Sequence, residues 1–189
     1  MTIPATRPTV DAAAGIEIRA LTAADAHWHL DGLCELLEDG VHAGASLGFL
    51  APLARREAEL DWQDLQPALS DANLLWIARA AEHIVGCVHM RLATTADARH
   101  RATVERLVVL STHRRRGIAG ALLAAAEREA LERGRTLLVL DVDAAAEAAR
   151  ALHRLGWDAA GTIPGYLAGA DGMPRDGTRL FKRLAPDAR

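Results

Sequence analysis

The sequence predicts an α/β fold in which helices cover both faces of a mixed β-sheet. Three observations lead to this class. Segments with strand and helix periodicity follow the order β-α-α-β-β-β-α-β-α-β-β. The strand, helix and strand between residues 101 and 140 have the order of a crossover that joins parallel strands. The last of these strands, Thr136–Leu140, is a continuous apolar run, as expected of a strand covered on both faces.

The composition indicates one soluble, globular domain. A chain of 189 residues and 20.2 kDa can bury about 70% of its unfolded surface around a single core. The net charge of −3 gives no reason to expect general binding to nucleic acid or membranes. No apolar run approaches the ~20 residues that cross a bilayer. We therefore expect a cytoplasmic protein, with residues 1–15 as a flexible N-terminal tail and residues 16–189 as a single domain.

The sulfur and imidazole side chains give no sign of a metal or disulfide site. Cys34 and Cys87 fall on predicted buried faces, and we expect them to be free, packed thiols in a reducing compartment. Neither has the cationic, histidine-adjacent setting that a nucleophile needs. The histidines have no zinc-type spacing, so no metal is expected.

In the N-terminal half, alternation and helical spacing predict the elements in turn. They are a strand at 16–19, a helix at 23–40, a second helix from about 54, and paired strands at 74–80 and 84–92. Thr22 with Asp25 gives the first helix a capped start, and Pro67 should end or kink the second. A connection rich in small residues, 41–49, lies between the helices.

The C-terminal half continues the alternation of strands and helices. Its predicted elements are a central strand at 101–110, a helix at 117–133, a strand at 136–140, a helix at about 145–155, and antiparallel strands at 157–163 and 178–184. Gly134 and Gly156 lie where glycine commonly ends a helix. A long Gly/Pro-rich loop is expected between the last two strands.

The stretch from Val104 to Gly120, VERLVVLSTHRRRGIAG, carries the strongest functional signal. An apolar strand ends in a turn, three arginines follow, and a glycine-flanked segment opens a helix. The unpaired N–H groups and the dipole at a helix start favour a bound anion, and arginines add cationic forks suited to phosphate. This predicts a phosphorylated ligand; the alternative is an ordinary turn with a solvated basic face. The signatures of a P-loop and of a dinucleotide fold are both missing from the sequence.

The spacing Arg114-x-x-Gly117-x-Ala119 after an L-x-V strand end resembles the pyrophosphate signature Q/R-x-x-G-x-G/A of the GNAT superfamily of acyl-CoA-dependent N-acyltransferases. The order of elements is also that of this superfamily, so the resemblance covers roughly residues 16–184. Two segments, LCELLEDGVHAGASLGFLAPL and IPGYLAGADGMPRDGTRLFKRL, are similar to the tabtoxin-resistance acetyltransferase type. The resemblance implies a three-layer sandwich with a mixed, mostly antiparallel seven-stranded sheet whose central parallel pair splays apart.

The same resemblance implies acetyl-CoA as cosubstrate. Its pantetheine arm would hydrogen-bond along the bulged central strand, and its pyrophosphate would lie at the start of the following helix. A backbone N–H near Val109 or Leu110 would stabilise the oxyanion of the thioester. The cofactor-binding residues implied in this way are Leu107, Val108, Val109, Arg114, Arg115, Arg116, Gly117, Ile118, Ala119 and Gly120.

Two carboxylates are candidates for taking the proton from an acceptor ammonium. Many GNAT relatives have a glutamate on the central strand, but the matching position here is Thr103. Glu105, two residues on, points to the same strand face, and Asp141 ends the buried parallel strand where the pair would part. For both, the alternative is a surface or strand-end acid with a cationic neighbour.

The proton donor to the departing thiolate is the least clear part of the predicted site. Relatives carry a tyrosine in the pattern A-x-x-L/F-Y, and here the pattern ends in His153, which is either the acid or a packed or solvated bystander. Tyr166, the chain's single tyrosine, is expected to line the acceptor pocket, and it is a candidate for a substitute acid. His42, Ser46 and Phe49 are expected to wall the acceptor side; the alternative is a tight helix–helix connection.

These features imply an N-acetyltransferase that transfers the acetyl group of acetyl-CoA to the primary amine of a small molecule by direct attack in a ternary complex. Detoxification of an antibiotic or antimetabolite is the role that the subfamily resemblance implies. The alternative is a non-catalytic acyl-CoA-binding regulatory module that has lost its proton donor at position 153. We expect a small-molecule amine as partner, no nucleic acid or membrane, and a monomer or homodimer.

Overall fold

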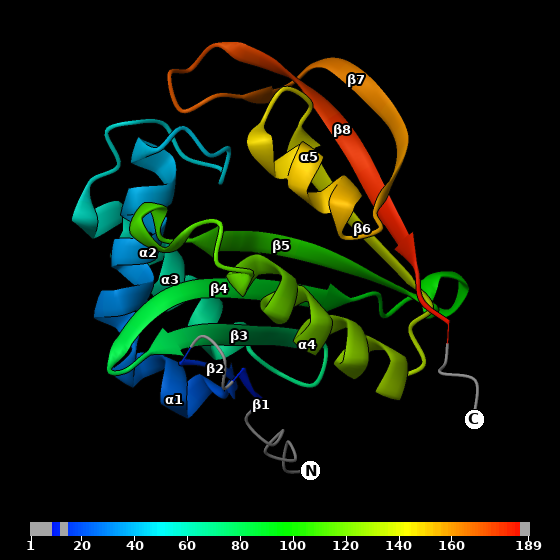
Figure 1. Ribbon diagram of the computed structural model, residues 1–189, viewed down its shortest axis with the longest axis horizontal. Helices are drawn as coiled ribbons and strands as arrows, with labels where there is room; N and C mark the ends of the chain where they lie inside the picture. The colour runs from blue at the N-terminus through cyan, green and yellow to red at the C-terminus, as the bar shows by residue number, and fades with distance from the viewer. Residues whose placement is uncertain (1–8, 12–14, 186–189) are drawn as a thin grey trace.

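The computed structural model describes residues 9–11 and 15–185, which fold around one twisted sheet (Figure 1). The described residues form eight strands in the order β1-β2-β3-β4-β5-β6-β8-β7. The strands are β1 (Thr9–Asp11), β2 (Ile16–Leu21), β3 (Asn73–Ala80), β4 (His83–Leu92), β5 (Arg101–Val109), β6 (Leu137–Asp143), β7 (Asp158–Ala168) and β8 (Pro174–Arg183). The α-helices are α1 (Ala23–Trp28), α2 (Leu30–His42), α3 (Arg55–Leu65), α4 (Ile118–Glu132) and α5 (Glu147–Arg154).

The predicted fold class is confirmed. The sheet is mixed and mostly antiparallel, and β5 with β6 is the parallel pair that the crossover predicted. The eighth strand is β1, which pairs antiparallel with β2 at one edge. It lies in the segment where we expected only a flexible tail; the rest of that expected tail, residues 1–8 and 12–14, lies outside the described residues.

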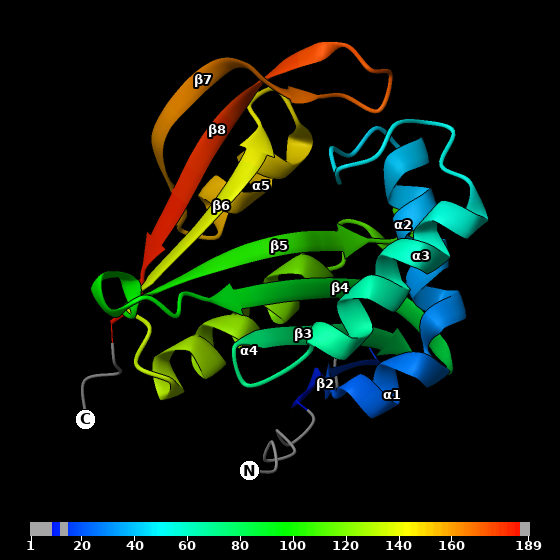
Figure 2. The ribbon, with the colours of Figure 1, turned by 180° about the vertical axis from the view of Figure 1, so that it is seen from behind.

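Helices cover both faces of the sheet, as the two opposite views show (Figures 1 and 2). α4 and α5 lie on one face, and α1, α2 and α3 lie on the other. The buried stripe of α2, with Leu33, Cys34 and Leu37, turns toward β4 and β5 because its apolar residues recur at helical spacing. Trp62 of α3 is buried and donates its Nε1–H to the carbonyl of Leu33 over 2.9 Å, which fixes α3 against α2.

Two of the predicted boundaries are wrong for identifiable reasons. The helix expected at 23–40 is two helices, because His29 has a non-helical backbone (φ −110°, ψ 7°) and separates α1 from α2. The loop expected between the last two strands is mostly strand, since β7 runs to Ala168 and β8 starts at Pro174. Pro164 is tolerated within β7 because that strand is at the sheet edge and its pairing shifts between Ile163 and Leu167.

The cysteines are free and buried, as the sequence predicted. Burial raises the pKa of the Cys34 thiol to about 11 and that of Cys87 to about 12. Both side chains are therefore neutral thiols at physiological pH. Among the described helices, none is both long enough and apolar enough to span a membrane.

Candidate active site

The parallel strands at the centre of the sheet separate after a short paired segment. β5 and β6 pair at Arg101–Leu137, Ala102–Leu138 and Thr103–Val139, and the ladder then ends although both strands continue. Beyond this point β6 leaves with β8 and β7, so that these three strands form a wing that diverges from β5 (Figures 1 and 2). The remainder of β5 thus has an edge without a strand partner.

A β-bulge lies in β5 at the start of this edge. Cys87 pairs with Val108 and His89 with Glu105, so that two residues of β5, Arg106 and Leu107, oppose one residue of β4. Arg106 has a positive φ of 48°, which is strained for a residue with a side chain.

The side chain of the bulge residue is anchored to α3. The Arg106 guanidinium forms two hydrogen bonds with the Asp61 carboxylate and lies 5.3 Å from the centre of the Trp62 ring. This two-point contact with α3 holds the strained residue and therefore the shape of the bulge.

The direction of the backbone amides along β5 follows from one hydrogen bond. The Leu110 N–H donates to the Val85 carbonyl of β4 over 3.0 Å. Because hydrogen-bonded pairs alternate along an antiparallel ladder, Val108 also bonds to β4, whereas the N–H and C=O of Val109 point toward the separated β6. Of the two predicted oxyanion donors, Leu110 is therefore used by the sheet, and Val109 faces the opening.

The predicted phosphate-binding stretch lies directly after this edge. Gly117, with φ 79°, is the N-cap of α4 and gives no side-chain cap, so the first N–H groups of the helix are left to a ligand or water. The first backbone bond into the helix is from the Ala121 N–H to the Gly117 carbonyl, 3.0 Å. Ile118, Ala119 and Gly120 thus have N–H groups that lack an acceptor within the helix.

The three arginines before Gly117 are exposed. Arg114 donates its Nε–H to the Val109 carbonyl over 3.4 Å, and Arg116 donates to the Thr112 carbonyl over 3.3 Å. Within the described part of the chain, none of Arg114, Arg115 and Arg116 forms an ion pair with a carboxylate. Their charge is therefore available to an anion at the helix start.

A carboxylate that the sequence did not single out fixes this loop to α2. Asp39 accepts hydrogen bonds from both the N–H and the hydroxyl of Ser111, each over 2.7 Å. Ser111 starts the short 3₁₀ turn that precedes the arginines. The contact joins residues 72 positions apart in sequence, so no local pattern could have predicted it.

Glu105 and Asp141 lie on the same face of the sheet, on opposite sides of the opening. Side chains of neighbouring residues in parallel strands share a face, and each acid lies two positions beyond the last pair, Thr103–Val139. Helix α2 covers this face, because the Val108 side chain packs toward Gly40 of α2. Glu105 shares the face of Val108, since their partners in β4, His89 and Cys87, are two residues apart.

Glu105 is held as a carboxylate. Its Oε1 accepts from Arg91 over 2.6 Å, and its Oε2 lies 3.2 Å from Nδ1 of His89. The close contact with His89 lowers the pKa of Glu105 most, partial burial opposes this, and the charges of Arg91, His89 and Arg106 lower the pKa further. Glu105 is thus ionised at neutral pH.

Asp141 lines a cavity on the wing. Arg179 of β8 donates two hydrogen bonds of 2.8 Å to its two oxygens, and this contact raises the pKa of Arg179. The cavity has a volume of about 350 Å³ and also contains Tyr166, Thr162 and Ile163. The Tyr166 ring packs over Gly177, where any larger residue would collide with it. The structure therefore brings the predicted Asp141 and Tyr166 together.

The sequence model of the acetyltransferase (GNAT) family matches residues 36–157. The chain belongs to this family. Ribosomal-protein-alanine N-acetyltransferase from Brucella melitensis is similar in structure, with a TM-score of 0.70 and 24% identity over 88% of this chain and 99% of that chain. A phosphinothricin acetyltransferase from Sinorhizobium meliloti, solved with acetyl-CoA, has a TM-score of 0.71 and 18% identity over 90% and 89% of the two chains. YncA from Salmonella typhimurium, solved with acetyl-CoA, has a TM-score of 0.71 and 16% identity over 93% and 97%.

These identities are low, so the three similarities concern the fold. The family assignment itself gives the general activity, which is acetyl transfer from acetyl-CoA to an acceptor. The backbone edge at Val109 and the open start of α4 fit this cosubstrate: the first offers an unpaired N–H beside a strand gap, and the second offers amides and arginines for a pyrophosphate.

In this GNAT protein His153 lies on the other face from the two acids. It is exposed in the last turn of α5, and its Nδ1 lies 2.8 Å from the Trp157 carbonyl. Because a carbonyl only accepts, Nδ1 carries a proton, and Nε2 has a proton to donate only in the imidazolium form.

The connection between α2 and α3, residues 43–54, meets the tip of the wing. The Ala51 N–H donates to the Ala170 carbonyl over 2.7 Å, so this loop and the β7–β8 connection touch. Nε2 of His42 accepts a hydrogen bond from the Leu53 N–H over 3.3 Å and thus closes the connection. This is the tight helix–helix connection that was the alternative to a role in the acceptor site. Ser46 has a buried hydroxyl without a hydrogen-bond partner, and Phe49 packs against the core.

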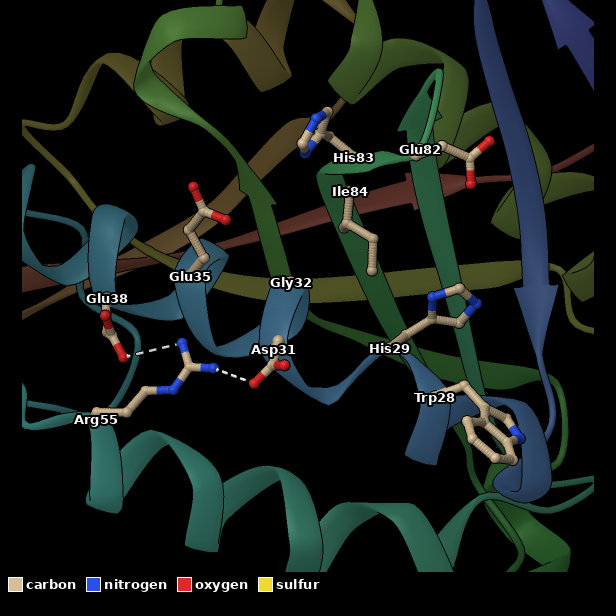
Figure 3. A pocket seen from close by; sticks show the side chains of 10 residues that line it. All are labelled: Trp28, His29, Asp31, Gly32, Glu35, Glu38, Arg55, Glu82, His83 and Ile84. Atoms are coloured by element: carbon tan, nitrogen blue, oxygen red, sulfur yellow. Dashed lines mark hydrogen bonds and ion pairs between the residues drawn. The ribbon is translucent and has the colours of Figure 1, made fainter.

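A second cavity, of about 400 Å³, lies away from these residues, between α1, α2 and the β3–β4 turn (Figure 3). Trp28, Glu35 and His83 are among its lining residues. Figure 3 shows Arg55 between Asp31 and Glu38. Its contacts of 2.6 Å with Asp31 and 3.5 Å with Glu38 partly neutralise these two carboxylates of the cavity. None of the predicted site residues lines this cavity.

Proposed function

We propose that this protein is an acetyl-CoA-dependent N-acetyltransferase that acetylates the primary amine of a small molecule. The observation that carries the proposal is the unpaired edge of β5: the ladder with β6 ends at Thr103–Val139, and the N–H of Val109 faces the gap. The open, arginine-flanked start of α4 follows directly. The thioester end of an extended phosphorylated ligand fits the edge of β5, and its phosphorylated end fits the start of α4.

The cosubstrate would bind along this edge and at the start of α4. The pantetheine arm adds to β5 at Leu107 and Val109, while the Val108 side chain packs below it, and residues 114–120 bind the pyrophosphate. The Val109 N–H then stabilises the oxyanion of the tetrahedral intermediate, a contact whose loss typically costs about 3 kcal/mol.

The acceptor would approach from the face that carries Glu105 and Asp141. An amine is an ammonium near neutral pH, and it must lose a proton before its lone pair attacks the thioester carbonyl. The two carboxylates are the proton acceptors that this face offers. The cavity of about 350 Å³ at Asp141 and Tyr166 suits a small molecule, which supports a small amine as acceptor.

Direct attack is favoured over an acetyl-cysteine intermediate. The pKa values of Cys34 and Cys87 are raised to about 11 and about 12, so neither offers a thiolate. The departing CoA thiolate takes its proton from His153 as imidazolium or from Tyr166, which is half-exposed in the acceptor cavity.

The acceptor class is supported by likeness to particular acetyltransferases. The segments 33–53 and 163–184 resemble the tabtoxin-resistance type, and a phosphinothricin acetyltransferase has the same fold. Both facts favour an amino-acid-like antibiotic or antimetabolite as acceptor and detoxification as the role. We further propose a cytoplasmic location and a monomer or homodimer.

One observation favours a second candidate, a non-catalytic acyl-CoA-binding module. His153, at the position where relatives carry a tyrosine, is held by the Trp157 carbonyl. CoA release from acetyl-CoA should therefore be measured with a panel of small amines, amino-acid analogues included. We expect at least one amine to cause CoA release that requires both the enzyme and the amine. Saturable acetyl-CoA binding with no release on any amine would contradict the enzyme and support the module.

A further inference from the structure

A buried histidine that the proposed reaction has not used lies beside Glu105. His89 of β4 is 3% exposed, and its ring stands between Asn73 of β3 and Glu105 of β5. A polar side chain so deeply buried needs partners for both ring nitrogens. The identity of those partners fixes where its protons are.

The orientation of the Asn73 amide can be assigned from a neighbouring carbonyl. Asn73 donates its Nδ2–H to the carbonyl of Ala68 over 3.1 Å. A carbonyl cannot donate, so the amide nitrogen is on that side and the amide oxygen faces His89. That oxygen only accepts, and Nε2 of His89 therefore carries a proton.

The other ring nitrogen faces a carboxylate. Nδ1 of His89 is buried without a well-aligned hydrogen-bond partner, and Oε2 of Glu105 lies 3.2 Å from it. If Nδ1 had no proton, its lone pair would face the lone pairs of an ionised carboxylate, away from water. A proton on Nδ1 replaces this repulsion with attraction, so the geometry favours an imidazolium beside the carboxylate.

The charges around the pair favour this state of Glu105. Arg91, on the same strand as His89, binds the other oxygen of Glu105, and Arg106 of β5 is the next cation, itself neutralised by Asp61 of α3. Toward β3 the ring contacts the neutral Asn73 amide. The Glu105 side chain is 31% exposed, whereas that of His89 is 3% exposed. Protons therefore reach Nδ1 of His89 by way of Glu105.

We propose that His89 is a positioning residue that makes Glu105, and not Asp141, the proton acceptor of the reaction. The proposal rests on the proposed function. After the pair has released a proton to solvent, Glu105 takes one proton from the acceptor ammonium, and Nδ1 of His89 holds that proton beside the carboxylate. The amine then attacks, the thiolate leaves, and the pair returns its proton to solvent before the next turnover. Asp141 cannot work in this way, because its partner Arg179 does not titrate near neutral pH.

A double-mutant cycle tests whether His89 acts through Glu105. His89→Gln keeps a donor of similar reach toward Asn73 but cannot hold a proton at Nδ1. We expect Glu105→Gln to lower kcat by about 100-fold, His89→Gln to lower it by about 10-fold, and the double variant to equal Glu105→Gln alone. His83→Gln, an exposed histidine on the same strand, is the matched control and should leave kcat unchanged.

The pH profile and the histidine NMR spectrum give readouts that a purely structural role would not change. In the pH profile of kcat/KM, the rise that is set by ionisation of the Glu105–His89 pair should move to another pH in His89→Gln. The rise that is set by deprotonation of the free amine should stay at its wild-type pH. In spectra of ¹⁵N-histidine protein, both ring nitrogens of His89 should be protonated at pH 7 in wild type, and Nδ1 should lose its proton in Glu105→Gln. Melting temperature and acetyl-CoA affinity, measured for every variant, check that the fold is intact.

Two results would overturn the inference while the proposed function stands: losses that add in the double variant, or an unprotonated Nδ1 of His89 at pH 7 in wild type. Absence of turnover by the wild-type enzyme on any amine is a different failure. It would overturn the proposed function and, with it, the catalytic role of His89.

Discussion

The two sides of the opening in the sheet are built very differently. The β5 side is covered by α2 and α4, and its acid is paired with a buried histidine as well as an arginine. On the wing, nearly every residue of β7 is exposed, and the acid is paired with an arginine alone. Beyond the short β5–β6 ladder, an ion pair joins the wing to the rest of the protein, where Lys182 of β8 binds Glu127 of α4 over 2.8 Å.

This contrast suggests a division of work in the proposed enzyme. Chemistry common to every acceptor needs fixed geometry, and the bulge, the Val109 amide and Glu105 all lie on the rigid β5 side. Recognition of one acceptor needs only a suitable pocket, and the exposed wing provides it at Asp141 and Tyr166. Kinetic, binding and stability measurements on variants of the two sides test this division.

The largest effect should separate the two acids. Glu105→Gln removes the proton acceptor and should lower kcat by about 100-fold with little change in the KM for the acceptor. Asp141→Asn removes a charge from the acceptor pocket and should mainly raise that KM, by about 10-fold, with kcat changed less. Steady-state kinetics with a saturating acetyl-CoA concentration measure both. The opposite split would assign the chemistry to the wing.

A smaller effect should come from the start of α4. Gly117→Ala forces a side chain into a backbone with φ 79° and should lower the stability by about 1 kcal/mol while weakening acetyl-CoA binding about 10-fold. Gly134→Ala, at φ 70° near the other end of α4, is the matched control with the same strain and no place in the site. Calorimetric titration and thermal melts compare them. Equal acetyl-CoA affinity in both variants would argue against a pyrophosphate at Gly117.

A pH effect on stability should belong to the β5 side. The pKa of Glu105 is lowered in the folded protein, chiefly by His89, from an ordinary value of 4.5. Its contribution to stability is therefore complete above pH 4.5 and is lost as the pH falls through the lower folded pKa. Chemical denaturation at several pH values should show wild type and Glu105→Gln converging in acid. A constant difference from pH 7 to pH 3 would mean that the carboxylate has no favourable partner.

The smallest effect should be at the cysteines. With thiol pKa values of about 11 and about 12, Cys34 and Cys87 should resist iodoacetamide at pH 7.5 in the folded protein, and activity should persist. Mass spectrometry of the treated enzyme measures the modification. Rapid alkylation accompanied by loss of activity would indicate a reactive thiol and reopen an acetyl-cysteine route.

The sequence predicted the fold class, and the strand–turn–helix arrangement of the stretch 104–120, because both are encoded locally. The apolar run at 136–140 and the glycine at 117 each specify one element and its end. The predicted helix and strand boundaries were wrong where contacts distant in sequence set them. At His29 two helices meet, and in the wing the pairing with β8 extends β7 through Pro164 and Gly165.

The supporting residues of the candidate site could not be predicted in the same way. Asp61 reaches Arg106, Asp39 reaches Ser111, and His89 reaches Glu105 across different elements. These contacts depend on register and on the bulge, which no single-strand pattern reveals. One signal was present: His89 is a polar residue within the apolar run 84–90, and a buried polar residue needs partners.

Backbone amide NMR tests directly whether acetyl-CoA binds along the unpaired edge of β5 and at the start of α4. On titration with acetyl-CoA, the amides of Val109, Ile118, Ala119 and Gly120 should shift with one common, saturable dissociation constant, while the Leu110 amide, already bonded to Val85, stays nearly unchanged. No saturable shift at these amides, or shifts confined to the cavity beside Trp28, would contradict the account.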